Sequence, residues 1–388
     1  MNTQKSYVWF IRLSAIILSL ITITVRNSAL GEEVYRSHIT QSAAPRNQVV
    51  ATIPIAPSAP YAMAMSADSS FLYVVGSVVG GLGVSVINAN TNQVVATYTI
   101  SQPGYDLTGF VALSKDGTQL YVPIAIPLSG GGYAGYVDEM STANGTLLNT
   151  FSCPGEPEAA VISPDGTQVW VMSAAGSSTT PANISIIDTT TQTIQPDVIE
   201  FNFKPYELNG IGWAFFSPNG KLFYLGEVIA SGVQGLTLVT DTASRKPVKL
   251  VLGGVDPPVL PTLNPSGTTL YAIRAFPSKG YSLWYASSKT YTVKGPFYQA
   301  PDGINIRQTI VTPNGTYLYA LELELGSTPS LFLNSFSTST RKAAGQTATL
   351  NSEALSIDSK CIISPNSSYL YVGCSANNSV YVVDIRPQ

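Results

Sequence analysis

The chain contains one histidine, His38, and that residue lies before the part of the sequence that repeats. A Ser-His-Asp triad uses a histidine as its general base, and histidine is also a common ligand of zinc and of haem iron. The repeated part of the chain therefore excludes a histidine-based hydrolase, a histidine-rich metal centre and a histidine-ligated haem.

Charged residues are also scarce, at 11% of the chain, and the formal net charge is −3. They are scattered, without the basic stripe that binding to a phosphate backbone requires, so nucleic acid is not an expected partner. Long stretches rich in Glu, Lys and Leu with a helical period are missing as well. Tyr, Thr, Ser, Gly, Val and Pro are abundant instead, a composition typical of short strands joined by turns.

The N-terminal segment differs in composition from the rest. Two basic residues precede an apolar run at 13–25, and small residues lie just before Glu32. This arrangement indicates a signal peptide, because the run is shorter than the roughly 20 residues that span a bilayer as a helix. We predict a signal peptide over 1–31 and a polar linker over 32–46, with an uncleaved anchor as the alternative. Cleavage would leave no membrane span, so the protein is expected to be secreted, periplasmic or on the cell surface.

One pattern recurs seven times: a short apolar strand, a Ser, Thr or Asn, a turn rich in Pro, Asp, Asn and Gly, and an apolar-aromatic-apolar strand. The copies are Ser66–Val74, Ser114–Val122, Ser163–Val171, Ser217–Leu225, Asn264–Ala272, Thr312–Ala320 and Ser364–Val372. Their first residues lie 47 to 54 positions apart, at or slightly above the period of a four-stranded propeller blade. Proline presets the first turn angle, Asp or Asn bonds to its own backbone, and glycine accepts a positive φ. Each copy therefore predicts a tight hairpin.

The ends of the repeated part predict a closed ring. Asn47–Thr52 has the same sequence as Asn92–Thr97, the expected fourth strand of the first blade, yet it lies before the first hairpin. The seventh repeat stops after its third strand, at Val380–Ile385. The N-terminal strand should therefore complete the last blade, which removes two exposed sheet edges. We predict an all-β fold, a seven-bladed β-propeller of four-stranded antiparallel blades over residues 47–388.

These repeats resemble the YVTN-repeat β-propeller family, which is also found in surface-layer proteins. The resemblance rests on Leu72–Val75, Leu120–Val122 and Leu370–Val372, together with Val84–Thr97. It covers roughly residues 47–388 and is weaker in the fourth to sixth blades. It implies the fold and says little about activity, since propellers host many unrelated functions.

Cys361 and Cys374 lie on either side of the last hairpin. In a regular hairpin centred between them the two would face each other on adjacent strands, close enough for a disulfide. A disulfide at that position and two buried thiols are the alternatives. Cys153 has no neighbour that would activate it as a nucleophile.

The start of each innermost strand, five positions before each hairpin motif, should lie at one mouth of the channel. These positions are Tyr61, Gly109, Glu158, Gly212, Val259, Arg307 and Ser359. We take Tyr61, Glu158 and Arg307, with Lys360 next to the last position, as candidate binding residues. Lactonase-type propellers, which the chain resembles in architecture, commonly place His, Glu and Arg around the channel, and that set is depleted here. No catalytic residue, metal site or cofactor is predicted, although rim carboxylates would suit calcium.

Several loops between the second and third strands of the blades are long. The expected examples are 76–83, 123–133, 173–182 and 227–235. Exposed loops with aromatic and polar residues suit protein or glycan recognition. The sequence favours a monomeric, non-enzymatic scaffold that binds a protein or glycan at the cell surface or in the envelope. The alternative is a lactonase-like or other hydrolytic or redox propeller that uses carboxylates at the channel mouth.

Overall fold

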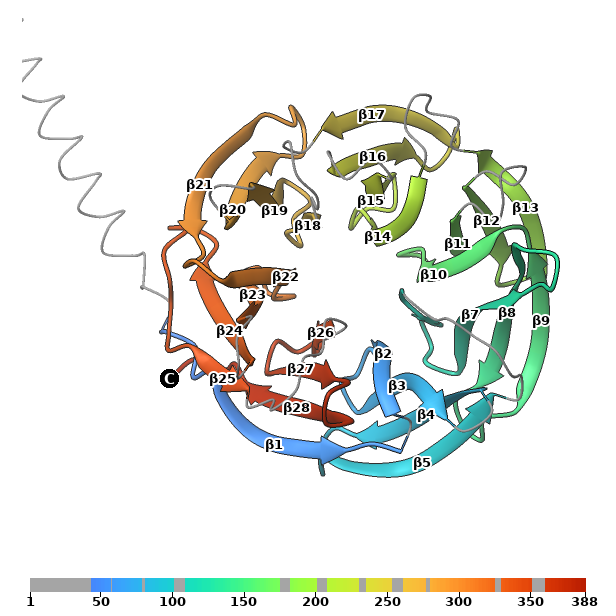
Figure 1. Ribbon diagram of the computed structural model, residues 1–388, viewed down its shortest axis with the longest axis horizontal. Helices are drawn as coiled ribbons and strands as arrows, with labels where there is room; N and C mark the ends of the chain where they lie inside the picture. Colours follow the sequence, from blue (N-terminus) through green and yellow to red (C-terminus); the bar gives the residue numbers. More distant parts are fainter. Residues whose placement is uncertain are drawn as a thin grey trace, which may run out of the picture. The chain divides into compact units, whose positions relative to one another are not determined.

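Seven four-stranded antiparallel sheets surround a central channel in the computed structural model of the protein, as Figure 1 shows. The structure describes residues 43–56, 58–78, 81–100, 109–174, 182–200, 208–229, 235–252, 261–276, 280–324, 329–350 and 360–388. Within these ranges every regular element is a strand. No helix suited to crossing a membrane occurs there. The expected signal peptide and most of the expected linker lie outside the described residues.

The strands of each blade follow one another from the channel to the rim, except in the last blade. Blades 1 to 4 consist of β2 (Ser58–Met65), β3 (Phe71–Val78), β4 (Gly81–Asn88) and β5 (Gln93–Ile100); β6 (Ala112–Leu113), β7 (Gln119–Pro127), β8 (Tyr133–Ser141) and β9 (Leu147–Cys153); β10 (Glu156–Ile162), β11 (Gln168–Ala174), β12 (Asn183–Asp188) and β13 (Thr193–Glu200); and β14 (Leu208–Phe216), β15 (Leu222–Ile229), β16 (Gly235–Asp241) and β17 (Lys246–Leu252). Blades 5 to 7 consist of β18 (Pro261–Leu263), β19 (Thr269–Phe276), β20 (Gly280–Ser287) and β21 (Val293–Gln299); β22 (Ile304–Val311), β23 (Tyr317–Glu324), β24 (Ser330–Ser337) and β25 (Ala348–Leu350); and β26 (Lys360–Ile363), β27 (Tyr369–Cys374), β28 (Ser379–Asp384) and β1 (Gln48–Pro54). The predicted seven-bladed, all-β propeller is confirmed.

The repeated motif forms the hairpin between the first two strands of each blade. In blade 3 the Ser163 hydroxyl donates to Asp165 Oδ1 at 2.6 Å, and the Gln168 amide donates back to Ser163 Oγ at 3.0 Å. The Thr167 amide also donates to Asp165, at 3.0 Å. Short polar side chains thus satisfy the backbone donors of the turn, which is why the motif requires them.

The aromatic residue of each motif lies in the packed interior of its blade. All seven are at most 5% exposed: Tyr73, Tyr121, Trp170, Tyr224, Tyr271, Tyr319 and Tyr371. Buried aromatic rings with a polar tip need a partner for that tip. Tyr121 Oη accordingly donates to Glu139 at 3.1 Å, and Trp170 Nε1 donates to Gln168 at 3.0 Å.

The ring closes as the sequence predicts, because β1 is the outermost strand of blade 7 and pairs with β28. Beside this pair, Asp384 accepts from Arg386 at 2.7 Å and from Arg46 at 3.2 Å. Asn47 joins the closing strand to blade 6, since its amide donates to Ser335 Oγ at 2.7 Å and its carbonyl accepts from Tyr319 Oη at 2.9 Å. Blades 6 and 7 are therefore linked by buried side chains as well as by packing.

Several outermost strands carry an exposed apolar residue at a shift in strand register. The four examples are 46 to 54% exposed: Val50, Val95, Leu148 and Val248. Each is skipped in the pairing of its strand with the neighbouring inner strand. Such bulges twist and interrupt an edge, which hinders pairing with another chain.

The opposed pair of cysteines expected in the last hairpin is not found. Cys361 lies opposite Val372, Cys374 pairs with Ser379, and both thiols are buried and free. The turn closes on Ser364, whose amide donates to the Tyr369 carbonyl at 2.9 Å. This places the hairpin centre one residue earlier than the midpoint of the two cysteines, so of the two alternatives the structure has the two buried thiols.

Candidate functional site

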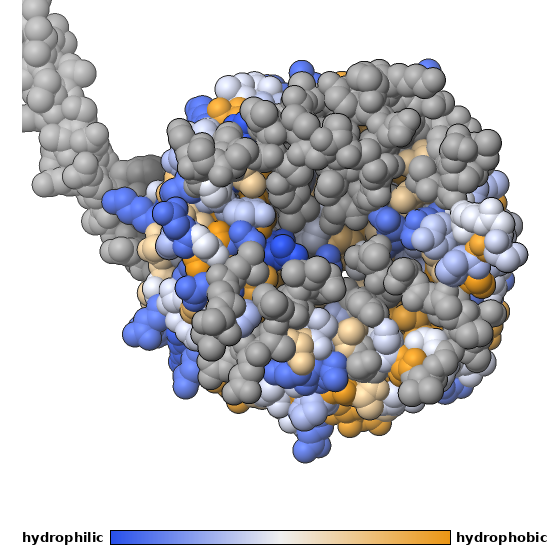
Figure 2. Space-filling model, viewed as in Figure 1, coloured by the Kyte–Doolittle hydropathy of each residue, from blue (hydrophilic) through white to orange (hydrophobic). Residues whose placement is uncertain are grey.

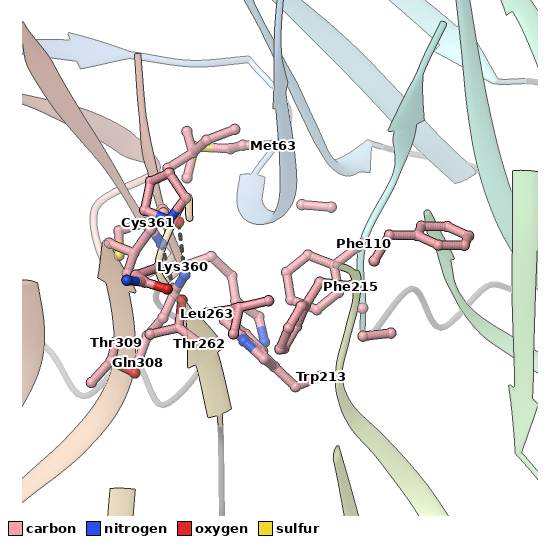
Figure 3. Close-up of a pocket in the computed structure, with 18 of the residues that line it drawn as sticks. Met63, Phe110, Trp213, Phe215, Thr262, Leu263, Gln308, Thr309, Lys360 and Cys361 are labelled. Carbon is pink, nitrogen blue, oxygen red and sulfur yellow. Dashed lines mark hydrogen bonds between the residues drawn. The ribbon is translucent and has the colours of Figure 1, made fainter. Parts of the chain in front are cut away.

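A cavity of about 330 Å³ occupies part of the central channel (Figure 3). Its walls are parts of the innermost strands β2, β14, β18, β22 and β26, together with the segment that leads into β6. Most of the lining side chains are apolar, and Phe110, Trp213, Phe215 and Phe216 are aromatic. Blades that are far apart in the sequence thus contribute to one concave, largely apolar surface.

An aromatic pair and a lysine meet in this cavity. The rings of Phe110 and Trp213 pack edge to face with centroids 4.6 Å apart. The ammonium nitrogen of Lys360 lies 5.6 Å from the Phe110 centroid and 5.7 Å from the Trp213 centroid. In Figure 3 the lysine reaches from β26 toward the tryptophan. Both distances are within the range of cation–π attraction, so the rings hold the charge inside the channel.

Gln308 fixes the backbone from which this lysine extends. Its side-chain amide donates to the Cys361 carbonyl at 2.8 Å and accepts from the Cys361 amide at 2.7 Å (dashed lines in Figure 3). Gln308 is 3% exposed, so both bonds are buried. The Gln308 side chain in β22 thus makes the two hydrogen bonds to the Cys361 backbone that a neighbouring strand would make. It thereby holds Cys361, the residue next to Lys360, in place.

Four of the predicted rim positions share one structural feature. Tyr61, Glu158, Gly212 and Arg307 are each skipped where the register of the innermost strand shifts. Glu158 and Arg307 are half-buried and do not line the cavity, whereas Lys360 does. The side chain of Tyr61 and the positions 259 and 359 lie outside what the structure describes.

Gly109 lines the cavity as predicted, but most of the lining residues of the inner strands come one position later than the predicted ones. Four positions before the hairpin motifs of blades 1, 2, 4, 6 and 7, the sequence places Ala62, Phe110, Trp213, Gln308 and Lys360, and all five line the cavity. Ala159, at the same place in blade 3, does not line it, and position 260 in blade 5 lies outside the described residues. Counting back four residues instead of five would have found Phe110, Trp213 and Gln308. The bulge in the inner strands causes the difference, since it adds a residue that does not follow the alternation of the strand.

The cavity wall offers few unsatisfied polar groups. Asn264 accepts from the Thr268 and Thr269 amides at 2.8 and 2.9 Å and donates to Ser266 Oγ at 2.8 Å. The Thr309 hydroxyl is buried and has no hydrogen-bond partner in the structure. Among the described lining residues none is acidic, and Lys360 is the one with a charge. This set can bind a ligand but does not contain an acid–base pair.

Buried carboxylates occur elsewhere, within the blades. Glu322 in β23 accepts from Tyr298 Oη at 3.1 Å and from Asn334 at 2.9 Å, and burial raises its pKa. Burial likewise raises the pKa of Asp138 and of Glu139 in β8. Each is hydrogen-bonded to a neighbour in its own blade, and none lines the channel cavity.

No group of three or more His, Cys, Asp or Glu side chains suited to a metal ion occurs in the described part of the chain. Calcium at the rim stays a prediction. The long loops expected between second and third strands fall partly outside the described ranges, at 79–80, 175–181 and 230–234. On the face shown in Figure 2, hydrophilic and hydrophobic residues are mixed among those the structure describes.

Comparisons with known proteins support the fold. No family model matches the chain, and no curated protein sequence is significantly similar to it. Among solved structures, Kuenenia stuttgartiensis hydrazine synthase aligns with a TM-score of 0.64 and 16% identity, over 86% of this chain and 98% of that one. The Cps50 (Swd1) β-propeller domain of Myceliophteria thermophila aligns with a TM-score of 0.59 and 11% identity, over 87% and 99%. At such identities the likeness concerns architecture, and the chain is a seven-bladed β-propeller.

Proposed function

We propose that this chain is an exported propeller of the YVTN-repeat type that works as a binding protein. Its partner would be a protein or a glycan at the cell surface or in the envelope, held at the mouth of the channel. The observation that carries this proposal is the composition of the cavity. Its described lining is mostly apolar and aromatic, with a few polar side chains and one cation, which suits binding and orientation of a ligand.

The enzymatic alternative would need a carboxylate as acid or base beside the bound substrate. Glu158 and Arg307, the charged residues expected to do this, do not line the cavity. The raised pKa values of Asp138, Glu139 and Glu322 belong to residues that are hydrogen-bonded to neighbouring side chains away from the channel cavity, where burial alone explains them. These observations favour binding over catalysis.

The proposal is tested with the purified full chain on two panels. One is an array of surface glycans and peptides, and the other is a set of lactones, esters and redox dyes assayed for turnover. We expect binding without turnover. Turnover that disappears in Glu158→Gln, with an unchanged melting temperature, would establish the enzyme instead.

Export is tested separately, by mass spectrometry of the protein made with its own N-terminal segment. We expect the exported form to begin at Glu32 and to be a monomer by light scattering. A chain that stays in the membrane with residues 1–31 attached would favour the uncleaved anchor.

A further inference from the structure

One face of the propeller carries the inner turns, between the first and second strands of each blade, and the outer turns, between the third and fourth. The two turns of blade 4 are bonded to each other, since Thr242 Oγ1 donates to the Gly220 carbonyl at 2.7 Å. Blades 2, 3, 5 and 6 have the equivalent bond. We call this surface the turn face. Its turns in blades 1 to 6 lie entirely within the described residues, so their charges can be compared.

The outer side of blades 4 to 6 gathers cations on this face. Seven lie on the outer turns or on the outermost strands that follow them, and we call them the basic arc: Arg245, Lys246, Lys249, Lys289, Lys294, Arg341 and Lys342. The two arginines are half-buried and the five lysines are exposed. In these described turns and strands the one acid is Asp241, which accepts from the Ser244 amide and hydroxyl at 2.8 and 2.7 Å. Positive charge therefore predominates along this part of the rim.

The basic arc is continuous, because β17, β21 and β25 are the outermost strands of three neighbouring blades (Figure 1). The Arg341 guanidinium of blade 6 lies 3.8 Å from the ring centroid of Tyr285 in blade 5. Tyr291, in the outer turn of blade 5, packs against the buried cluster that contains Tyr224 of blade 4. No cation of the basic arc forms an ion pair with a described residue. The arc thus presents its charge to a partner.

The turns of blades 1 to 3 carry the opposite charge. They hold four acids and one base: Asp68, Asp116, Asp165, Asp188 and Lys115. Hydroxyl and amide donors lower the pKa of all four carboxyls, so these groups are charged at neutral pH. The whole chain is divided in the same way, since residues 58–200 contain eleven acids and one base, whereas residues 201–388 contain ten acids and fourteen bases. A negatively charged partner of the basic arc would be repelled by the other half of the turn face.

We infer that the basic arc binds an extended acidic polysaccharide, whose charged groups contact the outer turns of several blades in succession. The cations are spread over three blades and do not line the channel cavity, so a single small anion would meet only a few of them. A polymer gains from each further contact, because the later contacts form within one molecule. Lysine and arginine both form charge-assisted hydrogen bonds with acidic groups.

Other polyanions fit the turn face less well. A flat anionic membrane would meet the acidic turns of blades 1 to 3 together with the basic arc, and those turns would repel it. The bases of a single-stranded nucleic acid stack on exposed aromatic rings. The outer turns expose hydroxyl groups beside the cations instead, on Ser244, Thr290, Thr292, Ser339 and Thr340. Hydroxyl groups can both donate to and accept from the hydroxyls of a sugar, which favours a polysaccharide.

The test measures binding of the full chain to immobilised polymers by biolayer interferometry. The main probe is polygalacturonate, and its matched control is the same polymer with its carboxylates methyl-esterified. We expect polygalacturonate to bind about tenfold or more tighter than the ester. Its affinity should fall about tenfold or more from about 50 to about 300 mM salt, because salt screens exposed charges. Monomeric galacturonate should compete about a hundredfold more weakly per carboxylate, because it lacks the linked contacts.

Three further probes represent the other classes of polyanion. They are poly-L-glutamate, an oligothymidylate and vesicles of phosphatidylglycerol. Each should bind at least about fivefold more weakly than polygalacturonate, because none offers both sugar hydroxyls and a path confined to the basic arc. Equal or tighter binding of one of them would overturn the polysaccharide and identify that class as the partner.

Substitutions that copy blade 3 make the test specific. Gln192 of blade 3 occupies the place of Arg245 and of Arg341, with a φ of 56° against 57° and 58°. Arg245→Gln and Arg341→Gln are therefore compatible with the backbone of the turns. Combined with Lys246→Thr and Lys342→Thr, they should weaken binding of polygalacturonate about tenfold or more. Melting temperatures confirm that this fourfold variant is folded.

Two single substitutions separate the basic arc from the net charge of the chain. Lys289→Gln removes an exposed lysine of the arc, and Lys115→Gln removes an exposed lysine of the turn face outside it. Both change the net charge by the same amount. We expect the first to weaken binding of polygalacturonate about threefold and the second to leave it unchanged.

The inference is overturned if the ester binds as tightly as polygalacturonate, if the fourfold variant binds like the unaltered chain, if Lys115→Gln weakens binding as much as Lys289→Gln, or if no polymer binds. The basic arc is separate from the channel cavity, so the inference goes beyond the proposed function and does not rest on it. Binding on the array that persists in the fourfold variant would leave the proposed function in place, whereas turnover dependent on Glu158 would refute that function and leave the basic arc untouched.

Discussion

The hairpin turns and the channel wall of this propeller are stabilised in different ways. Each turn is held mainly from within, as in blade 3, where the Ser163 hydroxyl, the Asp165 carboxylate and backbone amides bond to one another within six residues. Contacts between neighbouring turns are exposed or half-buried, such as the bond from the Asn314 amide to Ser367 Oγ. The channel wall depends on buried contacts between blades, such as the bonds of Gln308 to the backbone of Cys361. The comparison teaches that a change in the wall should disturb the neighbouring blade more than a change in a turn does.

Carboxylates show the same contrast. On the turns, hydroxyl and amide donors lower the pKa of Asp116 and Asp165, and they lower that of Asp68 to about 2. Inside the blades, burial raises the pKa of Glu139 and Glu322. The first group therefore stabilises the fold while charged, and the second while protonated.

Two glycines give the sharpest test of this comparison. A Cβ on Gly109 would lie 1.9 Å from the backbone oxygen of Glu158 in the next blade, so Gly109→Ala should force the two blades apart. We expect a loss of about 3 kcal/mol in the free energy of unfolding, measured by urea denaturation. Gly117, on a turn, has a φ of +75° and open space around its Cβ position, so Gly117→Ala should cost only about 1 kcal/mol of backbone strain. Equal losses would refute the distinction between wall and turn.

The second test removes one of the side chains that join blades 6 and 7. Gln308→Ala leaves the buried amide and carbonyl of Cys361 without these partners, and we expect a loss of about 2 kcal/mol in the same measurement. The matched control is Gln299→Ala, which removes an exposed bond to the Tyr281 carbonyl and should cost less than about 0.5 kcal/mol. A Gln308→Ala variant as stable as this control would show that the two bonds from Gln308 to Cys361 do not stabilise the contact between blades 6 and 7.

The third test uses pH. The folded-state pKa of Glu322 is raised above its ordinary value of 4.5, so the folded chain holds this proton to higher pH than the unfolded chain does. Its contribution to stability is present below pH 4.5 and is lost as the pH rises through the folded-state pKa. Glu322→Gln should therefore gain in melting temperature relative to the unaltered chain between pH 4 and pH 8. A difference that stays constant or shrinks over this range would show that burial does not control this carboxylate.

The smallest effect is expected on the turns. Asp165→Asn should change the free energy of unfolding at pH 7 by less than about 0.5 kcal/mol, because Asn219 already occupies the equivalent place in blade 4 and accepts from Ser217 at 2.8 Å. Because the pKa of Asp165 is lowered in the folded chain, its carboxylate stabilises the fold above pH 3.8. This stabilisation is lost as the pH falls through the folded-state pKa. A loss of several kcal/mol in urea denaturation would show that the turn depends on the charge.

The sequence predicted the turns and the ring closure because both are encoded locally. A Ser, Thr or Asn followed by a short turn rich in Pro, Asp, Asn and Gly marks each hairpin, and the identity of Asn47–Thr52 with Asn92–Thr97 identifies the closing strand. The errors arose where the strand register differs by one residue from the one assumed. The pairing of Cys361 with Val372 was missed because the turn centre lies one residue earlier than assumed.

The cavity was missed for a similar reason. Lys360 was recognised only as a neighbour of a predicted position, and Phe110 and Trp213 were not recognised at all. In blade 4 the cause is a register shift that skips the predicted Gly212 and places Trp213 in the cavity wall. Phe110, Trp213 and Lys360 belong to three different blades, and they are in contact only because the ring brings these blades together. More than a hundred residues of sequence separate Phe110 from Trp213. No local pattern encodes such a meeting, so only the closed ring shows it.

Ring closure also constrains how the chain can fold. The pairing of β1 with β28 joins residues that are more than 300 positions apart in the sequence. The hydrogen bond between Tyr319 and Asn47 joins residues that are 272 positions apart. Contacts of such high order form late, because the entropy of closing a long loop must be overcome before they contribute. During synthesis β1 emerges before the other strands and its partner β28 emerges last. The first six blades are therefore made while β1 is still unpaired. A chain that ends before Ser379 therefore leaves β1 without its partner strand and the ring open.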